Sequence, residues 1–285
     1  MDLHSITLEG IRIRYRDSGG DGPVLLMSSG IGQSLEFWDR QFDALSDRFR
    51  LIAWDYPSHG ESDPGTGAFD LNSLSRLCIA LLDALDVSRV ILVGNSLGGA
   101  VSLRVQALAP ARVAGLVLVA PAFTGPKVFA PFKLFTLPVL GSLLTKPSEK
   151  AVAMQVSGVF HPKFVPDKAL MDAIRRNVFK PGAQQPFLNF MRATLSLSGV
   201  RRAIVAETRD LFRDCTCPIL LVHGAQDKII PSDQSRDCAA LAPDATFEAF
   251  DACGHAPQLE HPNKFNDLLG DFLNRLAGFE ARKSM

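Results

Sequence analysis

The chain has 285 residues, enough for one large domain or two small ones, and 47% of them are hydrophobic, so a sizeable core is expected. Lysine and arginine total 30, as do aspartate and glutamate, and the formal net charge is zero. This balance argues against a protein that binds a nucleic-acid backbone, which needs a clustered basic excess, and favours a small neutral or amphipathic substrate.

No targeting or membrane-spanning segment is expected. The N-terminus lacks a basic stretch followed by an apolar run, and residues 90–103 and 113–126, the longest uncharged stretches, are shorter than a spanning helix. We therefore expect a cytoplasmic protein. The five cysteines are odd in number and irregularly spaced, which favours free thiols over a disulfide, redox or zinc motif.

Strands and helices are predicted to alternate up to residue 119. Residues 11–15 alternate apolar and polar side chains, as a half-exposed strand does, whereas later apolar runs are continuous, as in strands covered on both faces. Strands are predicted at residues 11–15, 23–27, 51–54, 90–93 and 113–119, and helices at 37–49, 71–85 and 97–108. This order is typical of a parallel sheet with helices on both faces.

The alternation breaks after residue 121. Residues 122–207 are rich in proline and carry helical patterns without strands between them, at 168–178 and 186–197. Strand patterns return at 218–222 and 245–250, with helical patterns at 232–241 and 263–276. We predict a core domain of residues 1–121 and 208–285, interrupted by a helical cap domain of residues 122–207.

Residues 94–98 carry a G-x-S-x-G motif between a predicted buried strand and a predicted helix. The glycines permit a sharp turn that holds Ser96 at its tip, beside the free N–H groups of the helix start. The alternative for Ser96 is an ordinary helix N-cap. The strand-turn-helix context favours a nucleophile elbow.

A serine nucleophile needs a base, normally a histidine that a carboxylate orients. In folds with such an elbow the acid and then the histidine follow the serine, each in a loop at the carboxyl end of a strand. Asp227 follows the strand predicted at 218–222, and His255 follows the strand predicted at 245–250. They are therefore the candidate acid and base, and structural or surface roles are expected for the other histidines.

From about residue 5 to residue 277 the chain resembles the α/β-hydrolases. Residues 55–63 resemble the family's D-x-x-G-x-G-x-S loop, with Ser58 in place of a glycine, and residues 224–231 and 254–262 resemble its acid and histidine loops. The resemblance implies an α/β-hydrolase fold: a mostly parallel eight-stranded sheet flanked by helices, with a helical cap inserted after the sixth strand. It also implies a catalytic triad of Ser96, His255 and Asp227.

The resemblance further implies an oxyanion hole formed by two backbone N–H groups. One belongs to Leu97, directly after the nucleophile, and the other to Ile31 in the loop after the strand at 23–27. The family usually has a histidine in that loop, where this chain has Ser29. The donor is a backbone group, so the change affects the support of the loop rather than the donor.

The expected reaction is two-step acyl transfer from a carboxylic ester to water, as in a carboxylesterase. Ser96 attacks, His255 moves the proton, and the substrate is a small molecule with a small to medium apolar acyl group. Neither a cofactor nor a metal is implied, and no nucleic acid is expected as a partner. The Phe-, Leu- and Pro-rich residues 123–144 are either ordinary cap packing or the wall of an apolar pocket.

Three alternatives stay open. A carbon–carbon bond hydrolase of a meta-cleavage product is suggested by the G-N-S-x-G-G pattern at residues 94–99, although the oxyanion loop lacks G-x-G-P-G and Ala256 replaces a usual tryptophan. Arg192 is a candidate for binding the carboxylate of such a substrate, although an ordinary solvated arginine is the favoured interpretation. The other two alternatives are a lactonase and a non-catalytic binding protein of the same fold. The sequence leaves the natural substrate, the oligomeric state and the mobility of the cap open.

Overall fold

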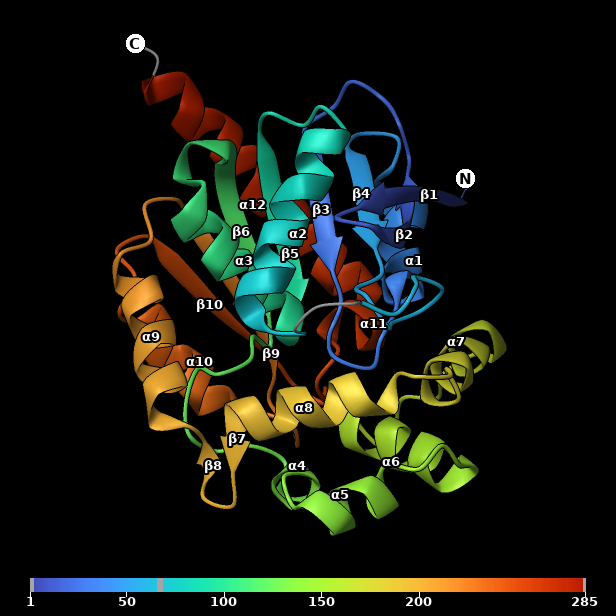
Figure 1. Ribbon diagram of the computed structural model, residues 1–285. Coiled ribbons are helices and arrows are strands. Elements are labelled where there is room, and N and C mark those ends of the chain that lie inside the picture. The colour runs from blue at the N-terminus through green and yellow to red at the C-terminus, as the bar shows by residue number, and fades with distance from the viewer. Residues whose placement is uncertain (1–2, 66–68, 284–285) are drawn as a thin grey trace.

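The computed structural model describes residues 3–65 and 69–283, and eight of its strands form one sheet (Figure 1). Their order is β1-β2-β4-β3-β5-β6-β9-β10, antiparallel between β1, β2 and β4 and parallel from β4 onward. The strands are β1 (Leu3–Leu8), β2 (Ile11–Asp17), β3 (Val24–Ser28), β4 (Arg50–Trp54), β5 (Val90–Asn95), β6 (Val113–Val119), β9 (Ile219–Gly224) and β10 (Ala245–Phe250). The predicted mostly parallel, eight-stranded sheet is confirmed.

Alternate residues of the central strands pack on opposite faces of the sheet. In β3, for example, Leu25 and Met27 contact one core cluster, whereas Leu26 contacts the other. All three side chains are fully buried, which explains why the pattern is a continuous apolar run. Burial of both faces is the main source of stability for such a sheet.

Helices cover both faces of the sheet (Figure 1). Helices α1 and α12 pack on one face, and α2, α3 and α10 pack on the other. Their bounds are α1 (Asp39–Leu45), α2 (Leu71–Ala84), α3 (Leu97–Leu108), α10 (Ser232–Ala239), α11 (Pro257–Glu260) and α12 (Pro262–Lys283).

The segment between β6 and β9 is mainly helical and lies across the carboxyl ends of the parallel strands (Figure 1). Its elements are α4 (Ala130–Phe135), α5 (Pro138–Leu144), α6 (Glu149–Val159), α7 (Lys168–Val178), α8 (Gln184–Thr194), β7 (Leu195–Ser196), β8 (Gly199–Val200) and α9 (Arg202–Arg213). Helix α9 runs through residue 207, the predicted end of the cap domain, and packs against α3 and α10. The division into two domains stays a prediction.

Among the helices of the described residues, none is both long enough and apolar enough to cross a membrane. All five cysteines are buried free thiols.

Candidate active site

Ser96 lies in a strained turn between β5 and α3. Its φ of 55° and ψ of −114° fall outside the conformations that non-glycine residues ordinarily adopt, and such a residue costs of order 1–3 kcal/mol. The turn is held by the Ser96 N–H, which donates to Val119 O at 2.9 Å, and by the Ser96 carbonyl, which accepts from Ala122 N at 2.9 Å. The surrounding backbone thus imposes the conformation of a nucleophile elbow.

The motif glycines are required because the backbone packs tightly around the turn. A Cβ atom on Gly98 would lie 2.0 Å from Ser28 O, and one on Gly94 would lie 2.3 Å from the carbonyl carbon of Gly98. Neither position has room for a side chain. The two glycines therefore allow β3, β5 and α3 to approach closely enough to form the elbow.

The candidate acid and base are in direct contact. His255 Nδ1 lies 2.6 Å from Asp227 Oδ2, and both side chains are buried. Because a carboxylate oxygen accepts, Nδ1 carries a proton, so the tautomer that this contact selects has its lone pair on Nε2, as a general base requires.

A second histidine, His223, contacts the same carboxylate. Its Nε2 lies 2.8 Å from Asp227 Oδ2 and 2.9 Å from Ile230 O. Both neighbours accept hydrogen bonds, so Nε2 carries the proton. His223 Nδ1 is buried without a partner among the described residues. The sequence indicated a structural role for His223 at the end of its strand but did not reveal this contact.

The other oxygen of Asp227 accepts hydrogen bonds from the backbone N–H groups of Ile229 and Ile230, at 2.7 and 3.1 Å. Burial by itself would raise the pKa of Asp227. The charge of His255 and the hydrogen bonds from His223 and His255 outweigh burial and hold that pKa well below the ordinary value of a carboxyl. Asp227 is thus ionised at neutral pH.

The histidine loop is tied to the elbow and to the cap by two side chains. Asn95 Nδ2 donates to His255 O and to Val119 O, both at 3.1 Å. The carboxylate of Glu260 accepts from the backbone N–H groups of Gly254 at 3.0 Å and Ala256 at 3.2 Å, and of His161 at 2.8 Å. These contacts fix the backbone on both sides of the histidine.

The described residues include no hydrogen bond between Ser96 Oγ and the ring of His255. In substrate-free hydrolases this contact is often long and shortens only when substrate is bound. The roles of Ser96, Asp227 and His255 as a triad therefore stay a proposal, for which the His255–Asp227 pair and the elbow supply the geometry.

The loop between β3 and the 3₁₀ helix Leu35–Trp38 lies against Ser96, since a Cβ atom on Gly30 would be 3.1 Å from Ser96 Cβ. Two side chains support it: Ser29 Oγ donates to Ser34 O at 3.1 Å, and Gln33 Oε1 accepts from Gly30 N at 2.8 Å. The replacement of the usual histidine by Ser29 was expected to change the support of this loop. These two hydrogen bonds support the loop instead.

The proposed oxyanion donors are the backbone N–H groups of Ile31 and Leu97. No hydrogen bond within the described part of the chain uses either of them. Both residues line the same cavity as Ser96. Two free N–H groups beside the candidate nucleophile match the requirement of an oxyanion hole.

Two adjoining cavities lie between the sheet and the helices that follow β6. The first, called here the Ser96 cavity, is lined mainly by apolar side chains, among them Phe123, Phe190 and Met191. The second, called here the cap cavity, has a volume of about 170 Å³ and lies among α4, α6 and α8. Ile31, Phe132 and Ile229 line both cavities, so the two meet beside the candidate nucleophile.

Comparison with known proteins identifies the fold family. A sequence model of the alpha/beta hydrolase fold matches residues 23–262. The chain belongs to the α/β-hydrolase family.

Relatives of this hydrolase differ in the activities that their names record. It is 30% identical over 269 residues, 92% of this chain and 90% of the other, to a 2-hydroxy-6-oxononadienedioate/2-hydroxy-6-oxononatrienedioate hydrolase of Cupriavidus pinatubonensis. It is 28% identical to the dihydrolipoyllysine-residue acetyltransferase component of the acetoin cleaving system of Cupriavidus necator, covering 92% of this chain but only 66% of that protein.

Solved structures share the architecture. A meta-cleavage product hydrolase from Pseudomonas fluorescens superposes with a TM-score of 0.80 at 25% identity, covering 95% of this chain and 97% of that one. A thermophilic esterase from Thermogutta terrifontis superposes with a TM-score of 0.77 at 20% identity, covering 97% and 99%. The second likeness supports the fold alone.

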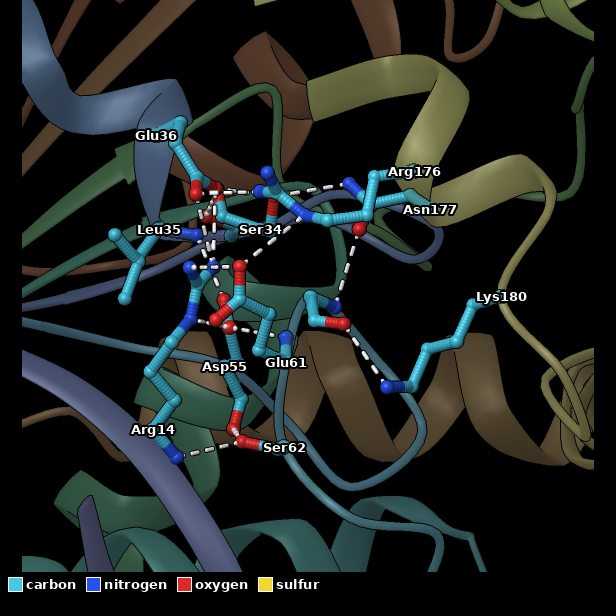
Figure 2. Close-up of polar contacts among 12 residues, drawn as sticks. Arg14, Ser34, Leu35, Glu36, Asp55, Glu61, Ser62, Arg176, Asn177 and Lys180 are labelled. Atoms are coloured by element: carbon cyan, nitrogen blue, oxygen red, sulfur yellow. Dashed lines mark hydrogen bonds and ion pairs between the residues drawn. The ribbon is translucent and has the colours of Figure 1, made fainter. Parts of the chain in front are cut away.

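A buried polar network joins the cap side of this hydrolase to the sheet (Figure 2). At its centre the guanidinium of Arg14 pairs with Asp55, at 2.5 Å, and with Glu36, at 3.0 Å. From helix α7, Arg176 also pairs with Glu36, and Asn177 Nδ2 donates to Ser34 Oγ at 2.9 Å. The network thus links α7 to the loop that carries the proposed oxyanion donor.

The second end of the network reaches the loop at residues 55–63 (Figure 2). Gly60 N donates to Asn177 Oδ1 at 3.1 Å, and Lys180 Nζ donates to Gly60 O at 2.9 Å. The same loop presents His59 and Ser58 to the cap cavity. The contacts of Arg176, Asn177 and Lys180 therefore connect the cap to the core.

His59 is buried in its neutral form. Its Nδ1 lies 2.9 Å from Pro57 O, and its ring stacks on Phe69 at 5.2 Å. Burial lowers the pKa of His59 from 6.5 to about 4, although the bond to Pro57 O opposes the change. The folded protein therefore keeps a neutral imidazole at the wall of the cap cavity.

This burial predicts a pH dependence of stability. Below pH 6.5 the unfolded chain binds a proton at His59 that the folded chain does not accept until about pH 4, so stability falls as the pH decreases through this range. Between pH 7.5 and pH 5, the decrease in the free energy of unfolding is expected to be about 2 kcal/mol smaller in His59→Gln than in the wild type. Urea unfolding at both pH values measures it, and an equal loss in both proteins would contradict the assignment.

Proposed function

We propose that this hydrolase is a serine esterase that cleaves a carboxylic ester with a small to medium apolar acyl group. The observation that carries the proposal is the position of Ser96 in a strained elbow, at the wall of an apolar cavity and beside two free N–H groups. Ser96 attacks the ester carbonyl while His255, held by Asp227, accepts the proton. The N–H groups of Ile31 and Leu97 stabilise the oxyanion, and His255 gives its proton to the alcohol as the ester C–O bond breaks. Water, activated by His255, then attacks the acyl-enzyme and releases the carboxylic acid from Ser96.

The charges around the cavities favour this substrate over that of the named dioate hydrolase relatives. A dioate carries two carboxylates, which cationic side chains normally bind. Among the residues that line the two cavities only Lys127 is charged, and its Nζ lies 3.5 Å from Asp233 on the surface. Arg192, the candidate for a carboxylate ligand, donates to Pro138 O at 3.1 Å and lines neither cavity.

Carbon–carbon bond cleavage is the second candidate, and sequence supports it. The relative named 2-hydroxy-6-oxononadienedioate/2-hydroxy-6-oxononatrienedioate hydrolase covers nearly the whole chain. The triad and oxyanion donors proposed here serve either reaction. The two candidates are distinguished by whether the wild type turns over a 2-hydroxy-6-oxo-dienoate faster than an ester of similar size.

The ester proposal predicts a dependence on acyl length. For p-nitrophenyl esters from acetate to decanoate, kcat/KM is expected to rise by up to about fourfold per methylene until the acyl chain fills the cap cavity, and then to fall. Ala151, on α6, lines that cavity, so Ala151→Phe is expected to shift the optimum to shorter esters.

The matched control lies on the same helix. Ala153 is exposed and lines neither cavity, so Ala153→Phe is expected to leave the optimum unchanged. A flat profile in the wild type, or the same optimum in Ala151→Phe, would show that the cap cavity does not hold the acyl chain.

A further inference from the structure

The outer surface of α4 and α5 is unusually apolar for an exposed helical surface. Five of the ten large hydrophobic side chains that are well exposed in the described part of the chain lie within residues 134–144. They are Leu134, Val139, Leu140, Leu143 and Leu144, called here the apolar cap face. Contiguous exposed apolar side chains of this kind mark an interaction site more often than chance exposure.

Helix α5 packs on its neighbours through Gly141 and through polar contacts at its C-terminal end. A Cβ atom on Gly141 would lie 2.3 Å from Phe135 O, so this side of α5 packs directly on α4. Gln184 Nε2, from α8, donates to Ser142 O at 2.9 Å and to Thr145 Oγ1 at 3.0 Å. These contacts hold α5 in place while Val139 and Leu143, 74% and 56% exposed, face outward.

The charges close to the apolar cap face in the sequence are mostly positive. From residue 122 to residue 150 the chain contains lysines at 127, 133, 146 and 150 and one acidic residue, Glu149, which pairs with Arg175 of α7 at 3.3 Å. No ion pair of the described residues involves Lys133, Lys146 or Lys150. Exposed apolar side chains close to several lysines are typical of a surface that enters the headgroup region of an anionic membrane.

We propose that the apolar cap face docks on the surface of an anionic lipid bilayer. Leucine and valine side chains enter the boundary between headgroups and acyl chains, and the lysines contact the lipid phosphates and carboxylates. The same segment lines the cap cavity on its inner side, through Phe132, Phe135 and Thr145. Docking therefore brings that cavity next to the lipid.

A second copy of the chain fits the apolar cap face less well. A two-fold dimer would bring the same surface of each copy together, so lysine would face lysine. Stable dimers also bury about 800 Å² on each partner, from 20–30 residues, whereas this face has only five apolar residues. Docking on a bilayer requires only exposed apolar side chains and nearby lysines.

Co-sedimentation of the purified protein with vesicles tests the proposal without any enzyme substrate. The wild type is expected to bind vesicles of phosphatidylcholine and phosphatidylserine, to bind phosphatidylcholine alone at least tenfold more weakly, and to be released by high salt. Val139→Ser and Leu143→Ser are each expected to weaken binding about tenfold. Lys146→Gln and Lys150→Gln are each expected to weaken it by up to about fivefold.

The matched control is Leu108→Ser, at a side chain 58% exposed at the end of α3 and away from the cap. It is expected to bind like the wild type, and thermal unfolding checks that every variant is folded. The proposal is overturned if the wild type does not sediment with anionic vesicles, or if Val139→Ser and Leu143→Ser bind as well as Leu108→Ser.

Sedimentation velocity of the wild type without lipid tests whether a second copy of the chain covers the apolar cap face. A stable dimer that Leu143→Ser converts to a monomer would assign the face to a second copy and overturn the proposal. The docking does not depend on the ester chemistry, so vesicle binding without ester turnover would contradict only the proposed function.

Discussion

Replacing Ser96 by alanine is expected to lower kcat for p-nitrophenyl butyrate by about 10⁴–10⁶-fold, with little change in KM. The variant loses the nucleophile, so the acyl-enzyme cannot form, and only the oxyanion donors and the binding cavity continue to assist attack by water. Alanine is smaller than serine and leaves the backbone of the elbow unchanged, so the fold is expected to persist.

The control for this variant is Ser75→Ala. Ser75 is fully buried on α2, where its Oγ donates to Leu71 O at 2.7 Å, and it lines neither cavity. Its loss removes a hydroxyl of the same kind without touching the site. If Ser96→Ala turned over the ester as fast as the wild type, Ser96 would not be the nucleophile, whatever the activity of Ser75→Ala.

Replacing Asp227 by asparagine is expected to lower kcat by about 10⁴-fold. The amide NH₂ group donates where the carboxylate oxygen accepts, so it binds an unprotonated Nδ1 and leaves the proton of His255 on Nε2. A base with its proton on Nε2 cannot accept one from Ser96. Steady-state kinetics measure the loss, and Asp214→Asn, at an exposed aspartate after α9, is the control.

The surroundings of Asp227 separate this catalytic effect from loss of the fold. The amide oxygen still accepts from Ile229 N and Ile230 N, which the carboxylate now binds at 2.7 and 3.1 Å. The acid loop is therefore expected to keep its conformation, and a cooperative thermal transition shows that it does. A folded Asp227→Asn protein with wild-type kcat would show that another group orients the base.

The sheet could be predicted because most of its strands carry patterns that local physics produces. Strands buried on both faces show continuous apolar runs, and these located β3, β4, β5, β6 and β9 to within two residues. Strand β1 (Leu3–Leu8) was not predicted, because an edge strand with mostly exposed side chains has little pattern of its own. The eighth strand was expected only from the resemblance to a family.

The helices after β6 were predicted in part. The patterns located α7 within residues 168–178 and placed α8 at 186–197, whereas the helix spans Gln184–Thr194 and is followed by β7. Helices α4 and α5 begin with or next to a proline and have six and seven residues, too few for a clear period. Five of their apolar residues are exposed, whereas Phe132 and Phe135 line the cap cavity, so the usual assumption that apolar residues lie inside applies to only part of these helices.

The acid and base candidates could be predicted from position, because each follows a strand at the edge where the elbow also lies. The groups that hold the acid and the base in place could not be predicted. Asn95, Glu260 and His223 act on backbone groups or on a carboxylate that only the folded chain brings near. The spacing of four residues between His223 and Asp227 at a strand end was the only local signal of such a contact.

Labelling with a p-nitrophenyl alkylphosphonate tests the central claim most directly. A serine made nucleophilic by a histidine–aspartate pair is expected to release one equivalent of p-nitrophenol, and the protein is expected to gain the mass of one phosphonyl group as its esterase activity is lost. Peptide mapping is expected to place the group on Ser96, and Ser96→Ala is expected to remain unlabelled. A phosphonyl group on another residue, or full ester turnover by the labelled protein, would contradict the account.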